Sequence, residues 1–170
     1  MGRPSNSTRS PTLRAFTLVE MAVVITLIGI LAAIAVPAYR HIALRSKAAA
    51  VINDIRTFST TFITYNTQNG RWPAATGTPG QVPVEVQDAL SSPFSAPTPI
   101  GGYYNWENDD SSNGFHVTAA ISICSTGTST MSDDLDLLQM INDLMESDGD
   151  LYSGSVRLGA TSNLVFIIEQ

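Results

Sequence analysis

Carboxylates gather near the C-terminal end of the chain, in the segment NDLMESDGDLYSG. Four of them surround Gly149, namely Asp143, Glu146, Asp148 and Asp150. Carboxylate oxygens in a turn are ligands that calcium prefers, so this segment is a candidate calcium site. Its spacing differs from that of the twelve-residue calcium loop, and a solvated acidic turn between a helix and a strand explains the same residues. We expect that no cofactor is required, with calcium as the one candidate.

Residues that could act as nucleophiles or general bases are sparse. His41 falls in a helical pattern and His116 in a strand pattern, and neither has a recognisable catalytic partner in the sequence. The sequence has no G-x-S-x-G elbow and no phosphate-binding loop pattern. Cys124, the single cysteine, lies in the apolar run HVTAAISICS and is interpreted as a buried, inert thiol. These observations predict a protein that is not an enzyme.

Glu20 is a carboxylate inside an apolar run, FTLVEMAVVITLIGILAAIAV, which extends from Phe16 to Val36. As a helix this run would be about 31 Å long at about 1.5 Å per residue, which matches the hydrocarbon core of a membrane. Two interpretations of the charge remain open. The side chain either reaches the lipid headgroups, or it pairs with a positively charged group.

Charge is distributed unevenly along the chain. The first 15 residues carry Arg3, Arg9 and Arg14 and no acidic residue. Positive residues beside a membrane span favour the cytoplasmic side, so we expect a cytoplasmic N-terminus and a periplasmic or extracellular C-terminal domain. From Phe58 onward, 13 acidic residues face only two basic ones, which disfavours binding to nucleic acid.

The residues from Arg14 to Tyr39 resemble the start of type IV pilin-like proteins, a family that includes type IV pilins and the pseudopilins of type II secretion. In that family a short basic leader ends in a small residue and is followed by Phe and then by Thr-Leu-hydrophobic-Glu. Here Ala15 precedes FTLVE, and Pro37 matches a proline that the family often carries. The family usually has Gly where this chain has Ala15, the next smallest residue.

The resemblance implies that a prepilin peptidase removes residues 1–15 by cutting between Ala15 and Phe16. It also implies that the new amine of Phe16 is methylated, and that Glu20 pairs with this amine in a neighbouring subunit. The implied partners are copies of the chain or other pilin-like subunits, membrane lipid, and an assembly machinery in the inner membrane. Major pseudopilins of this family often bind calcium near their C-terminal end.

One long helix is predicted in two parts, a transmembrane and assembly part at 16–39 and an amphipathic part at 40–70. Pro37 lacks the N–H that would bond the carbonyl of Ala33, and Gly29 is a second weak point, so we expect a bend. A fixed bend near the bilayer surface and local melting during assembly are both open. The amphipathic part repeats apolar residues at spacings of three and four: Leu44, Ala48, Val51, Ile55, Phe58, Phe62 and Tyr65.

Residues 71–170 are predicted to form an extracytoplasmic α+β domain. A proline-rich connector, with one helical turn around 85–90, precedes the hairpin segments GYYNWE and GFHVTAAISI. A helix is expected over 133–145, capped by Ser132, followed by strands in LYSGSVRLG and LVFIIE. The expected inner face of the helix over 133–145 consists of Leu135, Leu138, Ile141, Leu144 and Met145. The small antiparallel sheet would pack on the long helix.

Together these features predict a structural subunit of a type IV pilin-like filament, either a pseudopilin or a minor pilin. The lack of a cysteine pair favours a pseudopilin, because many type IV pilins close their C-terminal region with a disulfide. The alternative is a single-pass, membrane-anchored extracytoplasmic binding module that does not polymerise.

Overall fold

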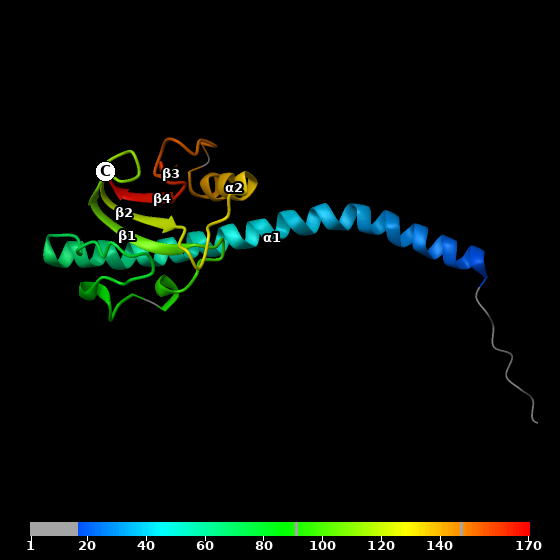
Figure 1. Ribbon diagram of the computed structural model, residues 1–170, viewed down its shortest axis with the longest axis horizontal. Coiled ribbons are helices and arrows are strands. Elements are labelled where there is room, and N and C mark those ends of the chain that lie inside the picture. Colours follow the sequence, from blue (N-terminus) through cyan, green and yellow to red (C-terminus); the bar gives the residue numbers. More distant parts are fainter. Residues whose placement is uncertain (1–16, 91, 147) are drawn as a thin grey trace, which may run out of the picture. The chain divides into compact units, whose positions relative to one another are not determined.

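The computed structural model describes residues 17–90, 92–146 and 148–170. Backbone contacts divide the chain into two units, Met1–Arg40 and His41–Gln170. The predictions for Ala15 and Phe16, and for the leader that precedes them, lie outside the described residues. Figure 1 shows the elements of the two units in order along the chain.

The helix α1 extends over Leu18–Asn69 and ends where the sequence predicts. Gly70 follows it with a φ of 67°, and the Gly70 N–H donates to the carbonyl of Asn66 at 2.7 Å. Glycine adopts this left-handed conformation without a steric penalty, so it stops the helix at little cost. The predicted apolar stripe is confirmed. Its end members, Leu44 and Tyr65, are partly buried. Its five central members are fully within the core: Ala48, Val51, Ile55, Phe58 and Phe62.

A four-stranded antiparallel sheet lies against the part of α1 that belongs to the second unit (Figure 1). Its strands are β1 (Tyr103–Asp110), β2 (Val117–Cys124), β3 (Val156–Leu158) and β4 (Leu164–Glu169), in the order β1-β2-β4-β3. The predicted hairpin and the α+β fold are confirmed. The strand expected in LYSGSVRLG is shorter than predicted, because the residues before Val156 form turns.

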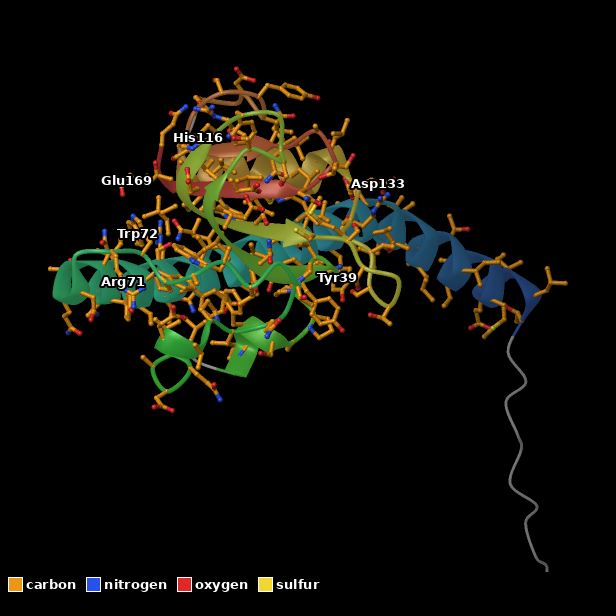
Figure 2. The ribbon with its side chains drawn as sticks, turned by 60° about the vertical axis from the view of Figure 1, so that its left-hand side comes forward. Tyr39, Arg71, Trp72, His116, Asp133 and Glu169 are labelled. Carbon is orange, nitrogen blue, oxygen red and sulfur yellow. The ribbon has the colours of Figure 1, made fainter. Side chains whose placement is uncertain are left out.

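Aromatic contacts join α1 to β1 at the centre of this core. The ring of Phe62 stacks on that of Trp106 with centroids 3.8 Å apart, and both side chains are fully buried. The indole Nε1–H of Trp106 donates to the carbonyl of Pro73 at 3.0 Å, so its one polar atom is satisfied. Trp72 donates in the same way to the carboxylate of Glu169 at 2.7 Å, which ties the connector to the end of β4 (Figure 2).

The connector between α1 and β1 contains two short 3₁₀ helices, where one turn was predicted. These are η1 (Val84–Val86) and η2 (Ser92–Ser95). Three of the connector's apolar side chains, Val86, Leu90 and Phe94, are buried in the main core. The segment is therefore held in place by the hydrophobic effect despite its many prolines.

The helix α2 extends over Leu135–Met145, and its predicted cap and inner face need correction. Asp134, not Ser132, is the N-cap, since its carboxylate accepts from the N–H of Asp136 at 3.1 Å. The inner face contains Leu137, whereas Leu135 is 61% exposed and Leu144 is 39% exposed. Leu138 and Ile141 are buried and Met145 is partly buried, as predicted. The N-cap leaves Leu135 as the first helical residue, on the outward-facing side of the first turn.

Asn142 is a buried polar residue on this inner face, in a place where the sequence pattern suggests only apolar packing. It is fully buried, and its Nδ2 donates to the carbonyls of Asp150 and Val156. These two bonds join α2 to the acidic turn and to the start of β3, so α2 is fixed by polar as well as apolar contacts.

Replacing Phe62 with Ala should strongly destabilise the second unit. The change removes a fully buried ring that stacks on Trp106, and such truncations cost about 3–5 kcal/mol. Chemical unfolding of the full chain in detergent, followed by tryptophan fluorescence, measures the effect. Ile63→Ala is the matched control, because Ile63 is its neighbour on α1 but is 46% exposed. Equal losses for the two variants would contradict the proposed core.

Candidate functional site

Thr17 and Glu20 form a reciprocal capping box at the start of α1. The backbone N–H and the hydroxyl of Thr17 both donate to Glu20 Oε2 at 2.8 Å, and the N–H of Glu20 donates to Thr17 Oγ1 at 3.2 Å. This arrangement satisfies N–H groups that have no partner within the helix, and it places the carboxylate at the positive end of the helix dipole. The T-x-x-E spacing, which the sequence analysis did not use, was the available signal.

The capping box also determines which carboxylate oxygen of Glu20 can accept a further hydrogen bond. Both Thr17 donors bind the same carboxylate oxygen, Oε2. Among the described residues no donor reaches the other oxygen, Oε1. A preorganised carboxylate with one free oxygen can accept a charged donor without first losing side-chain freedom.

The rest of the first unit presents apolar side chains outward. Its 18-residue window of highest mean hydropathy, 2.6, has no residue buried inside the protein, and α1 is long and apolar enough to cross a membrane. The hydroxyl of Thr26 donates to the carbonyl of Ala22 at 2.7 Å, so this polar group is satisfied within the helix. Such a surface is costly in water and requires lipid or other helices around it.

Gly29 and Pro37, the residues predicted to bend the helix, both lie inside α1. The helical assignment continues through each of them, from Leu18 to Asn69. No atom lies within 4 Å of a Cβ built at Gly29, so nothing in the described chain requires glycine there. The bend and the local melting both stay predictions.

Three of the four carboxylates of the candidate calcium site accept hydrogen bonds within the turn: Glu146, Asp148 and Asp150. Glu146 accepts from the N–H groups of Ser155 and Val156, and Asp150 accepts from the N–H of Tyr152 at 2.9 Å. Burial opposes ionisation of Glu146, but the bonds from Ser155 and Val156 outweigh it and lower its pKa. These bonds close the turn between α2 and β3.

Metal binding at this turn is not supported by side-chain geometry in the described chain. Among residues 17–90, 92–146 and 148–170, no group of three or more His, Cys, Asp or Glu side chains is placed to hold a metal ion. Asp148 accepts from the N–H of Asp150 at 3.2 Å, as expected of a turn that closes on itself. The calcium site stays a prediction.

A buried carboxylate that the sequence analysis missed lies on β1. Glu107 is only 4% exposed, and it accepts hydrogen bonds from the hydroxyl of Ser122 and from Asn113 Nδ2. Burial raises its pKa. Glutamate is rarely buried, and its partners come from β2 and from the β1–β2 loop, so no local sequence pattern marks it.

Cys124 is buried, as predicted, and lies beside Ser122, the residue that donates to Glu107. Its Sγ lies 3.2 Å from the hydroxyl of Ser122, and burial raises the pKa of its thiol. A raised pKa keeps the thiol protonated and unreactive. His116 is exposed, and its Nε2 lies 2.9 Å from Oδ1 of Asp109.

The comparisons with known proteins concern first the N-terminal segment. Residues 14–36 match the family described as the prokaryotic N-terminal methylation motif. A fimbrial protein of Eikenella corrodens is 41% identical over 61 residues, which are 36% of this chain and 40% of that protein. A type IV major pilin protein of Neisseria gonorrhoeae is 35% identical over 60 residues, 35% of this chain and 36% of that protein. The matched region thus spans about two fifths of these relatives.

A solved structure extends the likeness to the fold. The structure of the major type IV pilin of Clostridium difficile matches 75% of this chain and 97% of its own, with a TM-score of 0.52. The two sequences are only 15% identical there, so the likeness concerns the fold. Because the match covers 75% of this chain, the likeness extends beyond the N-terminal segment.

Replacing Gly154 with Ala should open the acidic turn. Gly154 has a φ of 76°, and a Cβ there would collide with the carboxylate of Glu146. Left-handed strain alone costs about 1–3 kcal/mol, and the collision adds to it. Thermal unfolding of the full chain in detergent measures the loss. Gly127→Ala is the matched control, since a Cβ at Gly127 meets no atom within 4 Å; equal melting temperatures for the two variants would contradict this account.

Replacing Glu107 with Gln should change how stability depends on pH. The folded pKa of Glu107 is raised, so the folded chain retains a proton that the unfolded chain loses near pH 4.3. The free energy of unfolding therefore decreases as pH rises from that value through the raised folded pKa. Gln has no such titration, so the variant should gain stability relative to the unsubstituted chain as pH rises. Parallel melting profiles from pH 4 to pH 8 would refute this.

Proposed function

We propose that this chain, which is type IV pilin-like in its N-terminal motif and in its fold, is a structural subunit of a filament. The finer assignment is a pseudopilin of a type II secretion system or a minor pilin. One observation supports this most directly. A capping box presents Glu20 at the head of an outward-facing apolar helix, inside the segment that matches the methylation motif.

Processing would complete the site that the capping box prepares. A prepilin peptidase cuts between Ala15 and Phe16, and the new Phe16 amine is methylated and keeps its positive charge. In the filament this amine binds Oε1 of Glu20 in a neighbouring copy. A charge left unpaired among apolar helices is expensive, so the pair penalises any stagger that separates the two groups.

The membrane holds the subunit before assembly. The apolar part of α1 spans the inner membrane, with Arg3, Arg9 and Arg14 on the cytoplasmic side and the second unit outside. An assembly machinery in that membrane would move the subunit out of the lipid into the filament. The exposed apolar side chains of α1 then exchange lipid for the helices of other subunits.

Replacing Glu20 with Gln should stop assembly without stopping membrane insertion. The variant keeps the length and hydropathy of the helix but loses the charge that binds the neighbouring amine. We expect the membrane fraction to retain the protein and the filament yield to fall by about tenfold or more, the scale of an unpaired charge in an apolar environment. Electron microscopy and quantitation of sheared filaments measure the yield.

Thr26→Ala is the control, because Thr26 also lies in the apolar part of α1 but bonds only within the helix. Mass spectrometry of the membrane-extracted protein reads the processing step, with a chain that begins at methylated Phe16 as the expected result. A normal filament yield with Glu20→Gln would remove this role for Glu20. Persistence as membrane monomers with the machinery present would favour the membrane-anchored binding module.

A further inference from the structure

The outward face of α1 in the second unit carries positive charge that its own chain does not neutralise. Five exposed residues recur at helical spacing opposite the buried stripe: Ile42, Arg45, Ala49, Asn53 and Arg56. We call this set the outer stripe of α1. No carboxylate belongs to it, and the nearby Asp54 instead accepts from the Tyr104 hydroxyl at 3.0 Å. Within the described residues, the ion pair of His116 with Asp109 is the only one.

A groove opens on the same unit beside the start of α2. Its volume is about 250 Å³, and its apolar lining includes Met131, Leu135, Leu138 and Tyr152. Leu135 is 61% exposed and Tyr152 is 76% exposed, which is unusual for side chains of this size and kind. We call this hollow the α2 groove.

One acidic residue lines the α2 groove, and a second is nearby in the chain on the first turn of α2. Asp133 lines it and is exposed, on the segment that leads into α2 (Figure 2). Asp136 is exposed on the first turn of α2, one helical position beyond Leu135. The groove is thus apolar inside and negative at its rim, whereas the outer stripe is apolar at Ile42 and positive at Arg45. Such complementary potentials favour one orientation of two surfaces over others.

The volume of the α2 groove and the spacing of Ile42 and Arg45 on α1 are compatible with each other. At about 250 Å³ the groove is small beside typical ligand pockets of about 300–1,000 Å³, and it has room for a branched aliphatic side chain. Ile42 is a side chain of that kind and is 66% exposed. Arg45 follows it by three residues on the same helical face, so it lies beside Ile42 and can reach the rim that Ile42 enters.

We propose that the α2 groove receives Ile42 of a second copy of this chain, with Arg45 of that copy against Asp133. Ile42 and Arg45 are exposed on α1 and line no part of the groove in their own copy, so one copy does not fill its own groove with them. The inference rests on the proposed function, because a filament is what repeats this contact. A single exposed ion pair is weak, but repetition between subunits that are already anchored makes it effective.

Disulfide trapping between two differently labelled copies tests the contact. One copy carries Ile42→Cys and the other Leu135→Cys, both with Cys124→Ala, and the two are expressed together with the assembly machinery. We expect a mixed disulfide-linked dimer in isolated filaments. The matched control pairs Ile42→Cys with Val84→Cys, since Val84 is another exposed apolar residue, on η1, and should give far less dimer.

Charge exchange is a second test that needs no thiol. Arg45→Asp and Asp133→Arg should each reduce filament yield by about two- to fivefold, the range that one exposed ion pair supports. Combining them should restore the yield. Arg71→Asp and Asp88→Arg are the matched controls, as both residues are exposed and lie outside the outer stripe and the groove; neither should change the yield.

The outcomes separate this inference from the proposed function. Normal filaments without the mixed dimer and without charge rescue would overturn the docking of Ile42 and leave the filament subunit intact. Thiols that cross-link only to other proteins would overturn it as well. Failure of the unsubstituted chain to enter filaments would overturn the proposed function, and this inference with it.

Discussion

The double use of one helix, α1, is the constraint on which the rest of the structure depends. In the first unit its side chains face outward and are apolar, and they need lipid or other helices. In the second unit one face of the same helix packs into the hydrophobic core, where Phe62 stacks on Trp106. The opposite face is left exposed and basic. Within the described residues the sheet therefore covers one side of this part of α1, and the opposite side is exposed.

Glu20 and Glu107 show two arrangements of hydrogen-bond donors around a carboxylate. At Glu20 the helix start supplies two donors from Thr17 to one oxygen, and no donor from residues 17–90, 92–146 or 148–170 reaches the other, which suits a charge that binds a partner. At Glu107 the partners Ser122 and Asn113 occupy both oxygens, and burial raises the pKa, which suits a structural role. The two sites thus differ in their arrangement of donors although the residue type is the same.

The turn after α2 uses part of its acidic composition to close on itself. Its carboxylates suggest a cation site, yet Glu146 and Asp150 accept hydrogen bonds from the backbone of their own turn. The same turn places Tyr152 at the α2 groove.

The sequence by itself determined the long helix and its end at Asn69, the apolar stripe, the hairpin strands and the segment that resembles pilins. Each of these depends on periodicity, on composition or on a motif among near neighbours in the chain. Only the tertiary structure decided the inner face of α2, the polar role of Asn142, the buried Glu107 and the α2 groove. Their partners lie far away in the sequence, and the pairing depends on how the sheet packs on α1. Local patterns carry no record of such distant contacts, because those contacts exist only once the chain has folded.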